Sequence, residues 1–202
     1  MKIYITRHGE TKWNIEGRIQ GHLDSELTEK GLDGAKKLKK RLANINIDLI
    51  ASSPLERAYK TARIIRGKRD IDIELNDKLK EINCGEFEGN RFEDIWRENP
   101  DAKIKLRNNP FKYIYPKGES LELFYNRVSE GYNEIIEKYK GKDILIVAHG
   151  GTIKSIIAQM FEKPDGSTWF KNVVKNCSLS IYDYDGESFK EILYNDTSHI
   201  WL

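Results

Sequence analysis

Three apolar segments of this chain each end in polar residues that lead directly into a helix or loop, and this repeated design constrains the fold more than any other feature. The transitions read ITRHG at residues 5–9, ASSPL at residues 51–55 and VAHGG at residues 147–151. Ligands of open α/β sheets bind in the crevice outside the carboxyl ends of the strands. If the three segments are neighbouring parallel strands, their polar residues meet in one such crevice.

Hydrophobic periodicity and turn residues predict the elements around these transitions. We expect strands at residues 2–6, 48–51 and 143–148, and helices at 28–43, 53–66, 120–140 and 152–161. Thr28 is a suitable N-cap, and Ser53-Pro54 supplies an N-cap followed by proline at the first helical position. Two further strands, 179–184 and 189–194, flank Asp185-Gly186, a dipeptide that favours a hairpin. Strands alternating with helices predict an α/β sheet with an antiparallel C-terminal part.

The segment 83–118 is less regular than the rest of the chain. Aromatic residues alternate there with Arg and Lys, and Pro100, Pro110 and Pro116 interrupt it. We expect a helical excursion that covers one edge of the sheet and forms a lid over the pocket. The chain has no internal repeat, linker or low-complexity tract, so residues 1–202 are expected to form one domain.

Charge and composition argue against several classes of partner. The 34 Lys and Arg residues against 32 Asp and Glu residues leave a net charge of +2, which predicts neither nucleic-acid nor membrane binding. The longest apolar run, residues 144–148, is far shorter than the roughly 20 residues of a membrane span. Cys84 and Cys177 lack CxxC spacing, so free thiols, no zinc site and a cytoplasmic protein are expected.

Four of the residues at or near the strand ends form a potential anion site. Arg7, His8, Arg57 and His149 would converge there if the strands are parallel neighbours, and guanidinium groups match phosphate oxygens in geometry. The glycines at 150 and 151 allow backbone N–H groups to approach an anion at a helix N-terminus. The residues themselves therefore indicate a phosphate-binding site.

The string TRHGETKWN at residues 6–14 resembles the signature of the histidine phosphatase superfamily, the phosphoglycerate mutase-like proteins. The resemblance continues in order from about residue 2 to residue 160. It includes the stretches 20–31, 52–62, 79–89, 118–120 and 147–151. It implies an α/β three-layer sandwich, with a mostly parallel sheet and helices on both faces.

The resemblance also implies a role for each matched residue. His8 would be the nucleophile that forms a phosphohistidine, and Glu81 would be the general acid and then the general base. Arg7, Arg57 and His149 would stabilise the charge on the transferred phosphoryl group, with no cofactor and no metal. The substrate-binding positions would be Asn14, Gln20, Gly21 and Gly150.

Within this superfamily the sequence favours a phosphatase over a mutase. Mutases carry a longer, arginine-rich insertion before the second histidine, whereas here 68 positions separate Glu81 from His149. The phosphatases of similar size are of the α-ribazole phosphatase, phosphoserine phosphatase and broad-specificity types. The expected partner is a small phosphate ester, and the oligomeric state stays open. The alternatives are a cofactor-dependent phosphoglycerate mutase and a non-catalytic phosphate-binding regulatory module.

The lid is expected to determine which phosphate ester is bound. Its candidate residues are Trp96, Arg107, Lys112, Tyr113 and Lys117.

Overall fold

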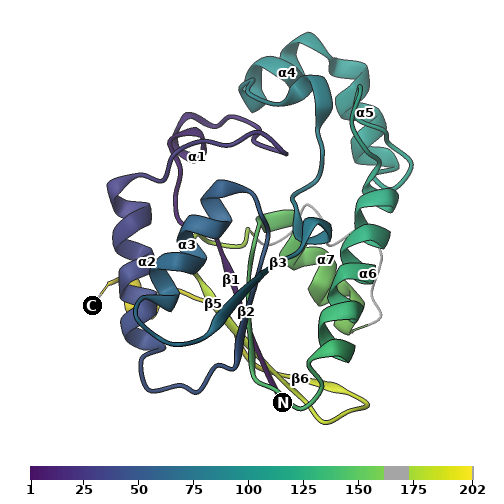
Figure 1. Cartoon of the computed structure of the whole chain (residues 1–202). Coiled ribbons are helices and arrows are strands. Elements are labelled where there is room, and N and C mark those ends of the chain that lie inside the picture. Colours follow the sequence, from purple (N-terminus) through teal and green to yellow (C-terminus); the bar gives the residue numbers. More distant parts are fainter. Residues whose placement is uncertain (162–172, 202) are drawn as a thin grey trace.

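The computed structural model describes residues 1–161 and 173–201, and a central sheet organises them (Figure 1). The sheet has the strand order β3-β2-β4-β1-β5-β6 in this described part. Its strands are β1 (Lys2–Arg7), β2 (Leu49–Ser52), β3 (Asp72–Leu75), β4 (Ile144–Ala148), β5 (Leu179–Tyr184) and β6 (Phe189–Asp196). The first four are mutually parallel, whereas β5 runs antiparallel to both β1 and β6. The mostly parallel sheet predicted from the sequence is confirmed.

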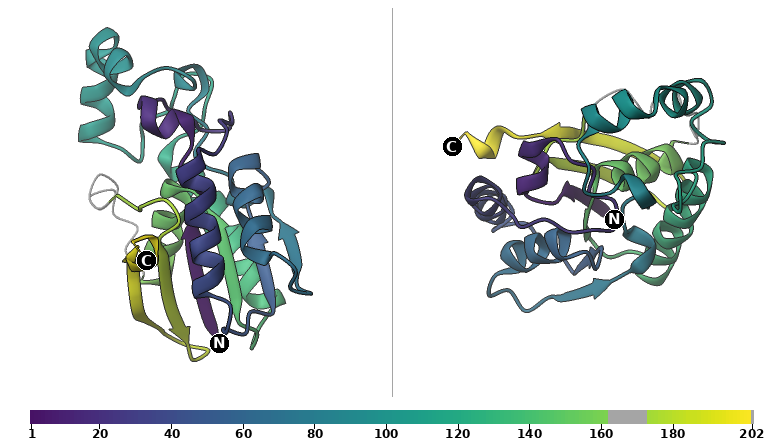
Figure 2. Two further views of the ribbon diagram at one scale, coloured as in Figure 1. Left: turned by 90° about the vertical axis from the view of Figure 1, so that its left-hand side faces the viewer. Right: turned by 90° about the horizontal axis from the view of Figure 1, so that it is seen from above.

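Helices cover both faces of this sheet (Figures 1 and 2). Strand side chains alternate between two cores, since Ile3 and Ile5 of β1 pack on one face and Tyr4 packs on the other. The first core includes residues of α6 (Leu121–Lys138) and α7 (Gly150–Met160), and the second includes residues of α2 (Glu29–Arg41) and α3 (Glu56–Arg66). The three-layer α/β architecture is therefore confirmed.

The predicted N-caps have different outcomes. Thr28 accepts a hydrogen bond from the Gly31 amide at 3.0 Å and caps α2 as expected. The Ser53 prediction is wrong, because α3 begins at Glu56 with Leu55 as its N-cap, and the carboxylate of the distant Asp24 accepts from its first amides. The Ser53 hydroxyl is instead engaged with His149.

Short helical elements surround the carboxyl end of the sheet. They are α1 (Lys12–Glu16), α4 (Phe92–Glu98) and α5 (Pro100–Asn108), with 3-10 turns η1 (Asp77–Leu79) and η2 (Gly85–Phe87), whereas a further turn, η4 (Ser198–Ile200), packs beside α2. We refer to α4 and α5 as the lid helices. None of the helices in the described ranges combines the length and the apolar character that crossing a bilayer requires.

The lid helices lie beyond the carboxyl ends of the strands and not along an edge of the sheet, so that part of the prediction is wrong (Figures 1 and 2). An aromatic cluster lies at their base. Phe87 makes edge-on contacts with Trp96 and Tyr115, at ring-centroid distances of 5.8 and 5.9 Å. Because such contacts favour mutual packing of the rings, the segment folds on itself above the strand ends.

Candidate active site

Three adjacent strands bring their polar ends together, as the sequence predicts. Strands β2, β4 and β1 are neighbours in the sheet. The amide of His8 donates to the Ala148 carbonyl at 2.9 Å, and the amide of Ser53 donates to the Val147 carbonyl at 3.1 Å. Backbone pairing thus continues one residue past β1 and β2 and holds these positions beside the end of β4.

His8 is held in one orientation by its own neighbour. Its side chain is buried, and Nδ1 lies 2.8 Å from the Gly9 carbonyl oxygen. A carbonyl only accepts, so Nδ1 carries a proton and Nε2 of the neutral ring carries the lone pair. Gly9 is itself constrained, since a Cβ there would lie 2.6 Å from the Gly31 carbonyl oxygen. Burial, reinforced by Arg7 and Arg57, lowers the pKa of His8 well below its usual range.

His149 lies against His8, with ring centroids 5.3 Å apart. Its Nε2 is 2.8 Å from the Ser53 hydroxyl, and its buried Nδ1 has no hydrogen-bond partner among the described residues. Burial is the largest influence on the pKa of His149 and lowers it well below the usual range, and Arg57 and His8 act in the same direction. Two neutral imidazoles therefore lie side by side at neutral pH.

Two arginines supply the positive charge of the site. Arg7 ends β1 and donates from Nη1 to the Val174 carbonyl at 2.7 Å. Arg57, from the first turn of α3, is 2% exposed and is held by the loop of residues 20–24. The buried Nε of each guanidinium has no partner among the described residues. Burial lowers the pKa of both groups, and Glu81 opposes that effect at each of them.

Glu81 follows η1 and is fixed by backbone amides. Its Oε2 accepts from the Gly151 amide at 2.9 Å, and its Oε1 accepts from the Ile82 amide at 3.0 Å. Arg127 of α6 holds the main chain before it, because its guanidinium donates to the carbonyls of residues 78, 80 and 81 at 3.0, 3.1 and 3.2 Å. Glu119 completes this arrangement with an ion pair to Arg127 at 2.6 Å.

A cavity of about 610 Å³ lies between these residues and the lid helices. Of the predicted site residues, it is lined by Arg7, His8, Asn14, Gln20, Gly21, Arg57 and Glu81. The other two predicted residues adjoin residues that line it. His149 packs on His8, and a Cβ at Gly150 would be 3.8 Å from Cζ of Arg7. Gly151, next in the chain, lines the cavity itself.

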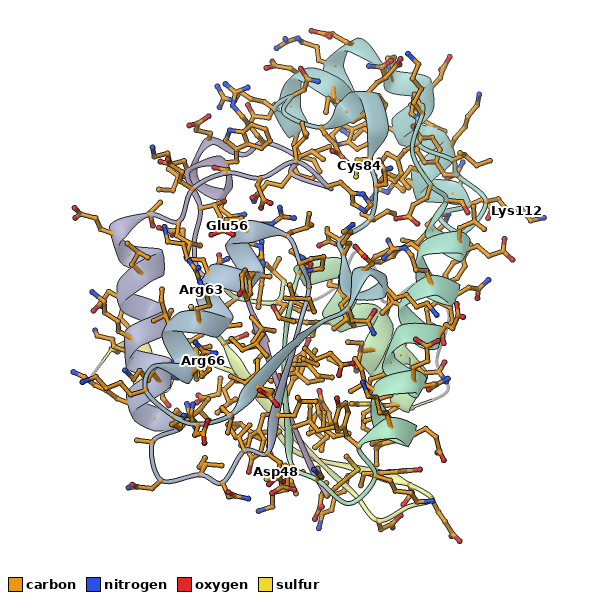
Figure 3. All side chains as sticks on the ribbon, in the orientation of Figure 1. Asp48, Glu56, Arg63, Arg66, Cys84 and Lys112 are labelled. Atoms are coloured by element: carbon orange, nitrogen blue, oxygen red, sulfur yellow. The ribbon has the colours of Figure 1, made fainter. Side chains whose placement is uncertain are left out.

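The lid residues named from the sequence divide into two groups. Trp96 and Arg107 line the cavity. Lys112 and Tyr113 border a separate depression, and Lys112 projects outward in Figure 3. Lys117 forms an exposed ion pair with Glu86 at 2.7 Å. Only the first group is in a position to contact a molecule in the cavity.

Apart from Gly151, which the sequence already placed near an anion, the other residues that line the cavity have no identifiable signal in the sequence. The remaining lining residues are Arg18, Ile19, Ile82, Cys84, Phe92, Lys103, Leu106, Tyr115 and Gly151. Cys84 is labelled below α4 in Figure 3, and burial raises its pKa well above the usual range.

Asn176, from far along the chain, donates to the His8 carbonyl at 2.9 Å and to Oδ1 of Asn14 at 3.3 Å. Lys103 precedes Arg107 by one helical turn, a spacing that indicates a shared face only once α5 is known.

The titratable groups of the site do not form a metal centre. In residues 1–161 and 173–201, no three His, Cys, Asp or Glu side chains are grouped so as to hold a metal ion. The arrangement offers instead a neutral imidazole nitrogen, two guanidinium groups and a carboxyl group around one cavity. Such a set can bind a phosphoryl group, accept it on nitrogen and exchange protons with an ester oxygen.

Comparisons with known proteins agree on one family. The profile described as "Histidine phosphatase superfamily (branch 1)" matches residues 3–197. By sequence, the chain is 32% identical over 203 residues to phosphoglycerate mutase-like protein 4 of Arabidopsis thaliana, with 98% of this chain and 86% of that protein covered. The solved structure of Bacillus stearothermophilus YhfR is similar with a TM-score of 0.91 at 37% identity, and 98% of each chain is covered. The alpha-ribazole phosphatase from Shigella flexneri has a TM-score of 0.90 at 28% identity, over 98% of this chain and 97% of the other.

Proposed function

The chain belongs to the histidine phosphatase superfamily and is a phosphatase, and on that premise we propose that it hydrolyses small phosphate monoesters through a phosphohistidine on His8. The observation that carries this proposal is the contact between Nδ1 of His8 and the Gly9 carbonyl, at 2.8 Å. Because Nδ1 holds the proton, the lone pair is on Nε2. The lowered pKa of His8 keeps that nitrogen unprotonated at neutral pH.

In the first step, Nε2 of His8 attacks phosphorus, the N–P bond forms, and the bond from phosphorus to the ester oxygen breaks. Arg7 and Arg57 stabilise the charge on the peripheral phosphoryl oxygens, a role that metal ions have in other phosphoryl-transfer enzymes. His149 donates a further hydrogen bond from Nδ1, which is otherwise without a partner among the described residues. Asn14, Gln20, Gly21 and the Gly150 amide complete the binding of the substrate.

Glu81 handles the protons. In its protonated form it donates to the departing ester oxygen, so that an alcohol leaves and not an alkoxide. The resulting carboxylate then takes a proton from water as the water oxygen attacks phosphorus and the N–P bond breaks. Free histidine, phosphate and protonated Glu81 are restored. The amide contacts of Glu81 with Gly151 and Ile82 support this assignment, because they hold the carboxyl group at the cavity wall.

The lid favours water over a second substrate as the acceptor. The lid helices are short, at Phe92–Glu98 and Pro100–Asn108, so water has access to the phosphohistidine. We propose further that the chain forms one domain, acts in the cytoplasm, and requires no cofactor or metal. The substrates proposed are phosphorylated metabolites small enough for a cavity of about 610 Å³.

The decisive experiment is phosphate release from p-nitrophenyl phosphate in the presence of EDTA, by the wild-type protein and by His8→Ala. We expect wild-type turnover and a loss of at least about 10³-fold in the variant, since the covalent route is removed. Full activity in His8→Ala would overturn the mechanism. Interconversion of 2- and 3-phosphoglycerate that outpaces hydrolysis would instead identify a mutase, and phosphate binding without turnover would identify a regulatory module.

A further inference from the structure

Glu88 joins two loops that are far apart in the sequence. Its Oε1 accepts from the His22 amide at 3.0 Å and from the Cys84 amide at 2.9 Å, and its Oε2 accepts from the Leu23 amide at 3.1 Å. One half-buried carboxylate therefore receives three backbone N–H groups. Hydrogen bonds to an ionised acceptor are about twice as strong as neutral ones, so this junction is well defined.

The first of these loops, residues 20–24, holds Arg57. The guanidinium donates to the Gly21 carbonyl at 2.7 Å, to the Leu23 carbonyl at 2.7 Å and to the Asp24 carboxylate at 2.8 Å. The amide of Leu23 is one of the groups bound to Glu88. Any shift of the Glu88 carboxylate is thus transmitted to the carbonyl groups that orient Arg57.

The second loop begins at Glu81. Its residue Cys84 is bound to Glu88, and the Glu81 carbonyl accepts from Nε2 of His22 at 2.9 Å. The two loops therefore meet at both the main chain of Glu81 and the carboxylate of Glu88. The proposed general acid and the proposed charge-stabilising arginine are located by the same junction.

The packing at Gly21 shows how closely the Glu88 carboxylate approaches the loop of residues 20–24. A Cβ at Gly21 would lie 1.9 Å from Oε1 of Glu88, and the residue has a φ of +50°, a conformation that favours glycine. The carboxylate therefore packs directly on the backbone that presents the Gly21 carbonyl to Arg57. Only a residue without a side chain leaves this space to Glu88.

We propose that Glu88 is a positioning residue that sets the location of the Arg57 guanidinium relative to the Glu81 carboxyl group. The proposal rests on the function proposed above, since it assigns Glu88 an effect on two groups of that mechanism. Glu88 itself does not line the cavity. Its effect is exerted through backbone amides and not by contact with the reacting atoms.

The test compares Glu88→Ala and Glu88→Gln with the wild-type protein on two substrates, p-nitrophenyl phosphate and glycerol 1-phosphate. A nitrophenolate leaves without a proton, whereas a glycerol alkoxide needs one from Glu81. We expect kcat/KM for glycerol phosphate to fall about 100-fold in Glu88→Ala, because displacement of a reacting group by about 1 Å has that effect. The fall in kcat/KM for the aryl ester should be about tenfold, because kcat/KM covers only the steps up to release of the alcohol, and for this ester those steps depend on Arg57 and not on a proton from Glu81. Glu88→Gln, which retains one oxygen acceptor, should recover part of both losses.

Glu86→Gln is the matched control, because Glu86 lies two residues away and its side chain, within the described part of the chain, forms only an exposed ion pair with Lys117. It should leave both rates unchanged. The proposal would be overturned if both Glu88 variants lost activity on the two esters in equal proportion, and if that loss matched their loss of folded protein measured by circular dichroism. If Glu88→Ala fails to fold, the losses on the two esters can still be compared in Glu88→Gln, which has nearly the same shape as the wild-type side chain. The His8→Ala result separates the two hypotheses, because activity in that variant contradicts the mechanism whatever Glu88 does.

Discussion

The hydroxyl of Ser53, beyond the end of β2, lies 2.8 Å from Nε2 of His149, beyond the end of β4. The Ser53 oxygen also accepts a hydrogen bond from the Leu55 amide at 3.3 Å. With its oxygen accepting there, the hydroxyl is free to donate its proton to Nε2 of His149. The proton of the neutral His149 ring is then on Nδ1, the nitrogen that has no other partner among the described residues.

This relationship predicts the effect of removing the hydroxyl. In Ser53→Ala, Nε2 of His149 loses its donor, and the ring can place its proton on either nitrogen. We expect kcat to fall about tenfold to 100-fold, because a donor to the transition state is weakened but not deleted. The rate should be measured with p-nitrophenyl phosphate. Ser52→Ala is the control, since the Ser52 hydroxyl donates to the Ser53 carbonyl and not to His149. A larger loss in the control than in Ser53→Ala would contradict this account.

The lowered pKa of His8 predicts how stability depends on pH. Above pH 6.5, the usual pKa of histidine, the ring is neutral in both the folded and the unfolded chain, so it makes no pH-dependent contribution. Below that pH, the unfolded chain takes up a proton that the buried ring does not. Each such group therefore lowers the free energy of unfolding by up to about 1.4 kcal/mol per pH unit as the pH falls below 6.5.

Urea denaturation at pH 7.0 and pH 5.5 checks this expectation. The loss of stability between the two pH values should be smaller in His8→Gln than in the wild-type protein, because the variant lacks the titrating ring. An identical pH dependence in the wild-type protein and His8→Gln would contradict the assignment of a lowered pKa to His8.

Two cationic side chains of the lid helices are expected to favour substrates that carry a second anionic group. Lys103 and Arg107 line the cavity from α5, and no carboxylate among the described residues pairs with either. We expect Lys103→Met and Arg107→Met to raise KM by about two- to fivefold for phosphate esters whose alcohol carries a second anionic group, the size expected for one exposed ion pair. Esters of uncharged alcohols should be unaffected.

The size of this effect should decrease as salt is added, since exposed charges are screened. Lys105→Met provides the matched control, because Lys105 is on the same helix and borders the outer depression. Two results would show that the lid cations do not select among substrates. One is an equal change in KM for esters of charged and uncharged alcohols, and the other is an effect of Lys105→Met as large as that of Lys103→Met.

The hydrogen bonds of Arg127 predict that removing its side chain lowers the stability of the fold. Its guanidinium serves three carbonyl groups and the Glu119 carboxylate, so Arg127→Met leaves several partly buried acceptors without a donor. We expect the free energy of unfolding to fall by about 1–3 kcal/mol, as for other lost hydrogen bonds of this kind. Chemical denaturation measures this change. Arg63→Met, which removes a half-exposed guanidinium paired with Glu56 at 3.7 Å, should change stability by less than about 0.5 kcal/mol.

Much of the fold follows from local sequence patterns. The apolar strands β1 and β4 and the hairpin of β5 and β6 agree with the predicted segments, because burial and turn chemistry are both recorded locally. The edge strand β3 (Asp72–Leu75) escaped prediction. Its residues alternate between polar and apolar, but the strand has only four residues and none of them is buried, so the pattern is too short to identify it. The start of α3 differs because a tertiary partner, Asp24, accepts from the amides of Glu56 and Arg57 at 2.8 and 3.3 Å and takes the role that a local rule assigns to Ser53.

The sequence by itself determined which residue types follow the strands and, from their order, the family of the chain. The tertiary structure alone decided the pairings that give those residues their states: Ser53 with His149, Glu88 with the amides of two loops, and Asn176 with the His8 carbonyl. It also placed Lys103 and Arg107 in the cavity wall while leaving Lys112 outside. The physical reason is that strand and helix patterns depend on near neighbours. Hydrogen bonds between loops depend on packing that brings together positions up to 168 residues apart.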